Sequence, residues 1–175
     1  MSYNIFIDLD ETLIASYIVS NPSNSVGERL KQKYEWYEHK CFITYLRPGA
    51  REFVNFCVSF FEKKHTFLLT YAISEYTYRI IKGLNIPHFN STNIFTREDL
   101  HRSPPIYTKD TNILIDDKPY NLHLYSGKAP LIGLKGENLL QIDEFYPIAN
   151  DIIEDTDPEF IRLQQLIKQN YGRKG

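Results

Sequence analysis

The sequence has little cysteine and no cluster of histidine and cysteine with the spacing of a zinc site. Its two cysteines, Cys41 and Cys57, do not form a C-x-x-C pair and lie in apolar contexts, the usual setting of a reduced, buried thiol. We therefore expect neither a disulfide framework nor structural zinc. This favours an intracellular protein, in the cytoplasm or the nucleus.

Long apolar runs and an excess of one charge are also missing. No apolar run approaches the roughly 18 residues of a membrane span, and the N-terminus does not have the pattern of a signal peptide. The formal net charge is −2, so no global basic field points to nucleic acid. We expect no membrane association, and a charged substrate would have to be bound by a local site.

What is present describes an ordinary globular protein. The 175 residues are 42% hydrophobic and contain no low-complexity tract, so they can bury a full core. We find no internal repeat. The sequence predicts one domain over residues 1–175, with a small insertion at about 15–41, and we expect a monomer.

Short apolar strands alternate with helical patterns along the chain. Strands are expected over residues 5–7, 41–46, 66–69, 93–96, 112–115 and 129–134. Helices are expected over residues 50–63, 74–82, 142–153 and 157–171, with a short helix within 28–36 and a helix start at Pro119. This alternation is typical of an α/β fold with a parallel sheet and right-handed crossovers.

Polar residues follow several of the expected strands at the point where each ends. Asp8 and Asp10 come after the first strand, Thr70 after the strand at 66–69, and Asp116 with Asp117 after the strand at 112–115. The carboxyl ends of parallel strands meet at one edge of a sheet, where ligands bind. Each piece alone has an ordinary explanation: an acidic turn with Thr12 as a helix cap, a strand threonine, or a turn with a helix cap. Together they indicate a site.

The combined motifs resemble those of the haloacid dehalogenase superfamily. They are Asp-Leu-Asp-Glu-Thr-Leu at 8–13, Arg47-Pro48-Gly49 ahead of a helix, Thr70, Lys109 and the pair Asp116-Asp117. More narrowly, the chain is similar to the RNA polymerase II C-terminal-domain phosphatases and their small NLI-interacting factor-like relatives, from Asn4 to about Gln169. The resemblance implies a three-layer, Rossmann-like α/β core with a mostly parallel central sheet and no large cap domain.

The resemblance also implies a role for each motif residue. Asp8 would be the nucleophile that forms a phospho-aspartyl intermediate, and Asp10 the general acid and base. Thr70 and Lys109 would bind the phosphoryl oxygens. Asp8 and the main-chain carbonyl of Asp10 would bind Mg²⁺, which prefers oxygen ligands. Asp116 and Asp117 would complete the metal site, one by direct contact and the other through water or by orienting Lys109, and either order fits the sequence.

The chain departs from the family pattern around Lys109. In the family a helix separates this lysine from the acidic pair, whereas here residues 107–111 run almost directly into the strand at 112. Lys118 and Arg97 are the alternative cations. Near the insertion, the aromatic residues Tyr34, Trp36 and Tyr37 are candidates for the wall of a substrate groove, with core packing as the alternative.

The expected function is that of a magnesium-dependent phosphatase acting on phosphoserine or phosphothreonine in a protein segment. A nucleotide or polynucleotide-end phosphatase is a second hypothesis, because a fold does not fix a substrate. The third is an inactive module that binds a phosphoprotein; the complete set of motif residues argues against it.

Overall fold

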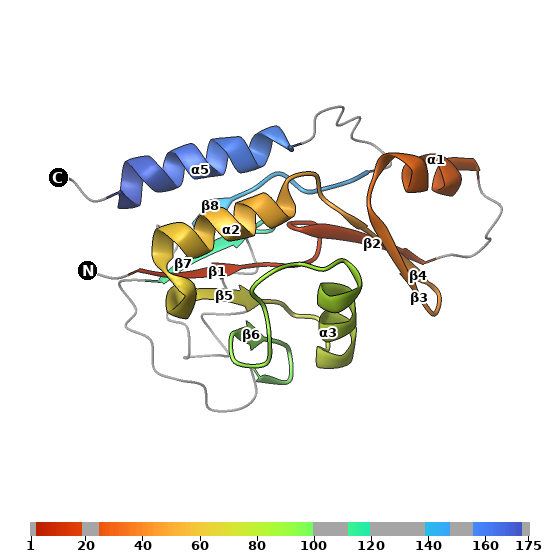
Figure 1. The fold of residues 1–175 in the computed structure, drawn as a ribbon, viewed down its shortest axis with the longest axis horizontal. Coiled ribbons are helices and arrows are strands. Elements are labelled where there is room, and N and C mark those ends of the chain that lie inside the picture. Colours follow the sequence, from red (N-terminus) through yellow and green to blue (C-terminus); the bar gives the residue numbers. More distant parts are fainter. Residues whose placement is uncertain (1–2, 19–24, 100–111, 120–138, 148–155, 173–175) are drawn as a thin grey trace.

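The computed structural model describes residues 3–18, 25–99, 112–119, 139–147 and 156–172. A five-stranded sheet with the order β6-β5-β1-β7-β8 forms the centre of the molecule (Figure 1). Its strands are β1 (Asn4–Ile7), β5 (Thr66–Leu69), β6 (Ile94–Phe95), β7 (Asn112–Asp116) and β8 (Leu139–Gln141). All the pairings between these strands are parallel, which confirms the predicted sheet.

The position of β1 brings the predicted site residues to one level of the sheet. β1 runs between β5 and β7, with Ile7 opposite both Leu68 and Ile115. The Asp8 N–H continues the ladder by donating to the Ile115 carbonyl at 2.9 Å. Asp8 therefore leaves β1 at the same height at which β7 ends.

The two faces of the sheet bury different side chains. On one face, Ile5 and Ile7 pack into a core shared with the helices α2 (Ala50–Phe61) and α5 (Pro158–Tyr171). These helices lie along the same side of the sheet (Figure 1). Phe6 alternates to the other face and stacks on Phe67 with ring centroids 5.1 Å apart. Burial of such a side chain contributes about 1.5–3 kcal/mol, so β1 is held from both faces.

The helix α2 begins at the Arg47-Pro48-Gly49 turn, as predicted. Gly49 has a φ of +80°, a left-handed conformation that glycine adopts without a Cβ clash. A Cβ there would also meet the Thr156 side chain at 2.6 Å. The backbone conformation and the lack of space for a Cβ together explain why glycine occupies this position of the motif.

A second sheet lies beside the first and was predicted only in part. It is antiparallel, with the order β2-β4-β3, and contains β2 (Ile14–Ile18), β3 (Trp36–His39) and β4 (Phe42–Leu46). Only β4 was expected. The helix α1 (Ser25–Lys33) covers part of the helix expected within 28–36, but Trp36 begins a strand.

The remaining elements confirm some predictions and correct one. The helix α3 (Ser74–Gly83) has the expected bounds to within a residue, and α5 begins after the expected N-cap, Asp157. The helix predicted from residue 142 is wrong over 142–147, which form no helix. The strand predicted at 129–134 and the helix predicted after Pro119 fall outside the described residues, apart from Pro119 itself.

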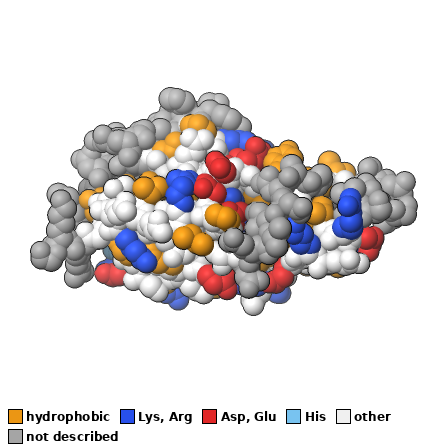
Figure 2. All heavy atoms as spheres, turned by 90° about the horizontal axis from the view of Figure 1, so that it is seen from above, with side chains coloured by type: hydrophobic (Ala, Val, Ile, Leu, Met, Phe, Trp, Pro, Cys, Tyr) orange, Lys and Arg blue, Asp and Glu red, His pale blue; other side chains and the backbone are white. Residues whose placement is uncertain are grey.

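The surface agrees with the absence of a basic field in the composition. Figure 2, which looks onto the molecule from above, shows Lys and Arg side chains interspersed with Asp and Glu over the described part of that face. No helix of the described segments is long and apolar enough to cross a bilayer.

Candidate active site

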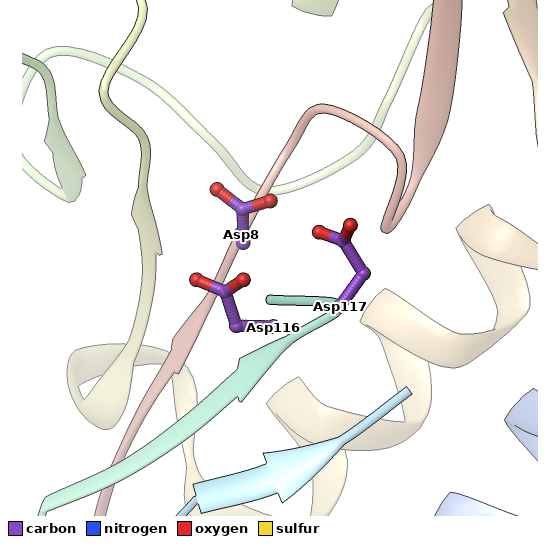
Figure 3. A group of neighbouring side chains, drawn as sticks. All are labelled: Asp8, Asp116 and Asp117. Carbon is purple, nitrogen blue, oxygen red and sulfur yellow. The ribbon is translucent and has the colours of Figure 1, made fainter. Parts of the chain in front are cut away.

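Three of the predicted site residues converge beyond the ends of the central strands. One carboxylate oxygen from each of Asp8, Asp116 and Asp117 lies within 4.8 Å of the others. Figure 3 shows these side chains at the ends of β1 and β7, with their carboxyl groups turned toward a common region. Asp116 is fully buried and the other two almost so. This is an arrangement that like charges do not adopt without compensation.

The loop after β1 is a tight turn that leads into β2. Leu13 and Ile14 donate their N–H groups to the Leu9 carbonyl, and Glu11 has a φ of +61°. A left-handed non-glycine residue costs on the order of 1 kcal/mol, which the surrounding contacts must offset. The alternative explanation, in which Thr12 caps a helix, is wrong. Instead the Thr12 hydroxyl reaches Asp117 Oδ1 at 3.4 Å.

Burial and neighbouring charge raise the pKa of several site carboxyls. The pKa of Asp8 lies well above its usual range, first because of burial and then because of the negative charges of Asp116, Asp10 and Asp117. Burial also raises the pKa of Asp117, against the nearby Lys118 ammonium. Burial and mutual repulsion thus disfavour ionisation of these carboxyls, and a bound cation would favour it.

Asp10 and Thr70 complete the described part of the predicted site. Asp10 Oδ1 accepts a hydrogen bond from the Tyr76 hydroxyl at 2.8 Å. Burial raises the pKa of Asp10 to about 6, and the bond from Tyr76 opposes that rise. The buried Thr70 Oγ1 accepts from the Ala72 N–H at 3.1 Å, and a hydrogen bond from the Thr70 side chain also opposes the rise in the pKa of Asp10.

The donor set suits a hard divalent cation. Asp117 Oδ2 is buried, and the cation beside it among the described residues is the Lys118 ammonium, whose Nζ lies 3.3 Å away. A single ammonium does not balance the three clustered carboxylates, so the cluster favours a further cation. All the clustered donors are carboxylate oxygens, as Mg²⁺ prefers.

The cation predicted for the phosphoryl group remains untested, because Lys109 lies outside the described residues. Of the alternatives, Lys118 directly follows the acidic pair, and its Nζ forms ion pairs with Glu11, Asp117 and Glu144. Burial lowers its pKa, but the carboxylates of Glu11 and Asp117 raise the pKa overall. Lys118 thus stays charged at the edge of the site. Arg97 instead lies over the Tyr71 ring, 5.7 Å from its centroid.

The aromatic groove wall proposed from the sequence is wrong for Tyr34. Its ring is buried against Tyr45 and Phe145, in the core of the small sheet. Tyr37 packs on α3 so closely that a Cβ on Gly83 would lie 2.5 Å from its ring. Trp36 is exposed and has the Lys31 ammonium 4.5 Å from its ring centroid.

Two residues that contact the loop after β1 were not predicted from the sequence as parts of the site. Tyr76 was expected only as part of a helix start, and Arg47 only as part of a turn motif. Arg47 is buried, forms a 2.7 Å ion pair with Asp157, and donates to the carbonyls of Thr12 and Asp143. The signal for Arg47 was present, because an arginine ahead of Pro-Gly belongs to the family motif; nothing in the sequence pairs Tyr76 with Asp10.

The sequence model of the NLI interacting factor-like phosphatases matches residues 3–174. The chain belongs to this family. Membership in the NLI interacting factor-like phosphatases confirms the resemblance drawn from the motifs. No curated protein matches the sequence.

Solved structures agree with the family at the level of the fold. A variant of the fission yeast RNA polymerase II CTD phosphatase Fcp1, bound to beryllium fluoride, superposes with a TM-score of 0.53 at 14% identity, over 96% of this chain and 52% of that one. A second structure of Fcp1, described as an essential RNA polymerase II CTD phosphatase, gives 0.53 at 17% identity, over 96% and 50%. This NLI interacting factor-like chain thus spans about half the length of those structures. The predicted α/β core with a parallel central sheet, without a large cap domain among the described residues, is confirmed.

Proposed function

We propose that this protein is a Mg²⁺-dependent phosphomonoester hydrolase that acts on phosphoserine or phosphothreonine in a protein segment, with Asp8 as its nucleophile. The observation that carries the proposal is the convergence of Asp8, Asp116 and Asp117 beyond the strand ends, with Asp10 on the same loop. Membership in a phosphatase family supports it, as does the shared fold with enzymes described as CTD phosphatases.

The chemistry proceeds in two displacements at phosphorus. A carboxylate oxygen of Asp8 bonds to phosphorus while the bond to the serine or threonine oxygen breaks, and Asp10 protonates that leaving oxygen. In the second step water attacks the phospho-aspartyl group and gives its proton to Asp10, and the bond between phosphorus and Asp8 breaks. Inorganic phosphate leaves, and both aspartates return to their starting protonation states.

Charge balance determines the roles of the other residues. Thr70 donates its hydroxyl hydrogen to a phosphoryl oxygen, and Lys109 or Lys118 supplies positive charge. Asp8, Asp116, Asp117 and the Asp10 carbonyl would hold the Mg²⁺, which neutralises the nucleophile and the phosphoryl oxygens when it is bound.

The competing hypotheses differ in substrate and in activity. A nucleotide or polynucleotide-end phosphatase would use the same residues, so only substrate preference separates it from the protein phosphatase. An inactive binding module has no need for a buried cluster of carboxylates with raised pKa values, because such a cluster destabilises the fold unless it binds a cation.

Hydrolysis of a phosphoserine peptide tests the proposal. Turnover should require Mg²⁺, stop with a chelator, and disappear in Asp8→Asn, whose amide cannot attack phosphorus. Asp143→Asn, which changes an exposed aspartate, is the matched control and should keep wild-type activity. Binding of the peptide without any turnover would support the inactive module, and undiminished turnover in Asp8→Asn would remove Asp8 as the nucleophile.

A further inference from the structure

A chain of hydroxyl groups leads from Asp10 into the small antiparallel sheet. The Tyr76 hydroxyl lies 2.8 Å from Asp10 Oδ1. On its other side it lies 2.6 Å from Ser16 Oγ, which in turn lies 2.7 Å from Thr44 Oγ1. The groups come from the loop after β1, from α3, from β2 and from β4, so only the assembled fold brings them together.

The number of hydroxyl hydrogens available fixes the donor and acceptor roles in this hydrogen-bond network. An ionised Asp10 can only accept, so the single hydrogen of the Tyr76 hydroxyl goes to Asp10. Tyr76 must then accept from Ser16, and the Thr44 hydroxyl donates to Ser16 or to Tyr76, which it also contacts. Every hydroxyl hydrogen points toward the site, and a satisfied network of this kind holds its members rigidly.

The surroundings keep Tyr76 itself in place. Its ring packs edge-on against Phe42 at 6.3 Å and against the hydrophobic core. Ser16 and Thr44 are directly opposite each other in the register of β2 and β4, and Thr44 is fully buried. The Tyr76 side chain is therefore held at both ends: α3 fixes its backbone, and Ser16 and Thr44 of the small sheet fix its hydroxyl.

We propose that Tyr76 is a positioning residue, which holds the Asp10 carboxyl in the orientation needed for proton transfer. This inference rests on the proposed function. A general acid must come within about 2.6–3.2 Å of the leaving oxygen, and a carboxyl on a turn has two side-chain torsions to restrain. With Oδ1 engaged by Tyr76, the transferable proton sits on Oδ2, and the group stays aimed between the two steps.

Kinetics across leaving groups test this role. Tyr76→Phe keeps the ring and removes the hydroxyl; Tyr78→Phe, an exposed tyrosine of the same helix, is the matched control. The parameter to measure is kcat/KM, because it reports the steps up to departure of the leaving group. Tyr76→Phe should lower it at least about tenfold for a phosphoserine peptide, as part of the 10²–10⁴-fold contribution of an acid. Aryl phosphates with good leaving groups should be almost unaffected, and Tyr78→Phe should match the wild type.

Equal losses for aryl and alkyl esters would overturn the inference, because they would show a general structural effect. Ser16→Ala, which removes one support and leaves the tyrosine in place, should give a smaller loss with the same dependence on the leaving group.

Crystal structures of the wild type and of Tyr76→Phe provide a readout that does not depend on turnover. In the variant the Asp10 carboxyl should leave the orientation that it has beside Tyr76, and an unchanged orientation would overturn the inference. If the wild-type protein hydrolyses no phosphate ester, the proposed function fails, and these structures still decide whether Tyr76 positions Asp10.

Discussion

At the scale of single residues, the site concentrates negative charge that folding alone would avoid. Asp8 is the clearest case, because burial and the charges of Asp116, Asp10 and Asp117 all raise its pKa. A group held in this way costs free energy at neutral pH in the absence of a cation and becomes useful once a cation is bound. Stability and function thus oppose each other here.

The first prediction concerns the stability of Asp8→Asn. Because the folded-state pKa of Asp8 is raised, its contribution to stability is fully present below the unfolded value and is lost as pH rises through the folded value. In chelator, the stability of Asp8→Asn relative to the wild type should therefore increase as pH rises toward about 7.5. Urea unfolding at several pH values measures this difference.

Magnesium provides the control for that experiment. The ion should stabilise the wild type more than the variant, since binding to the native state adds to its stability. A difference between the two proteins that does not change with pH would contradict the raised pKa of Asp8.

The second prediction concerns the pH dependence of catalysis. Asp10 must carry a proton when the leaving group departs, and burial raises its pKa to about 6, so the protonated fraction falls above that pH. The rate for alkyl phosphates should therefore decline on the alkaline side of an acidic optimum. Asp10→Asn should lower the rate most for substrates with poor leaving groups. Profiles of kcat against pH for alkyl and aryl esters check this; an alkaline optimum would argue against Asp10 as the acid.

The sequence allowed Asp8, Asp10, Thr70 and the acidic pair at 116–117 to be predicted for a physical reason. An apolar run that stops at a polar residue marks the end of a buried strand, and parallel strands end together. The bond between Tyr76 and Asp10 joins residues 66 positions apart, and no local pattern encodes it. The catalytic roles of all these residues stay predictions, as does the place of Lys109 in the site.

At the scale of secondary-structure elements, a buried ion pair links the site loop to the C-terminal helix. Arg47, at the end of β4, pairs with Asp157, whose other carboxylate oxygen accepts the Glu159 N–H at the start of α5. Arg47 also holds the Thr12 carbonyl in the loop after β1. One guanidinium thus links the loop after β1, the Asp143 carbonyl and the start of α5.

The third prediction is that Asp157→Ala is strongly destabilising. It leaves the Arg47 charge buried without its partner and removes the helix cap, so the loss should be about 3–5 kcal/mol. Arg162→Gln breaks the more exposed pair with Glu159 and should cost no more than about 1 kcal/mol. Urea unfolding of both variants compares the two pairs, and similar small losses would show that the buried pair does not hold α5.

Two segments were not predicted correctly from the sequence, for different reasons. The strand β3 has no fully buried residue, so its pattern differs little from that of a loop or a polar helix. Over 142–147 a helical pattern is overruled, because the Phe145 N–H bonds to the Glu11 carbonyl and the Asp143 carbonyl accepts from Arg47. Tertiary hydrogen bonds thus determine the backbone conformation of residues 142–147.

At the scale of the whole molecule, the small size of the additions to the core bears on the substrate. The described part of the chain adds only a three-stranded sheet and a short helix beside the strand ends. An enclosing cap is what lets an enzyme surround a small ligand and exclude water. Without one, binding energy must come from contacts along an extended substrate.

The fourth prediction follows from that openness. The kcat/KM for a phosphoserine peptide should exceed the values for free phosphoserine and for nucleoside monophosphates by at least about tenfold, roughly 1.4 kcal/mol. Steady-state kinetics with the three substrates measures the ratio, and a preference for the free nucleotide would favour the nucleotidase hypothesis.

The central claim is that the phosphoryl group passes through Asp8, and trapping the intermediate tests it most directly. Protein quenched during turnover of a phosphoserine peptide is treated with borohydride, which reduces an acyl phosphate to an alcohol, and the fragment containing residue 8 is analysed by mass spectrometry. We predict homoserine at position 8 in the wild type, in Asp10→Asn as well, and none in Asp8→Asn. Turnover without reduction at position 8, or reduction at another residue, would contradict the account.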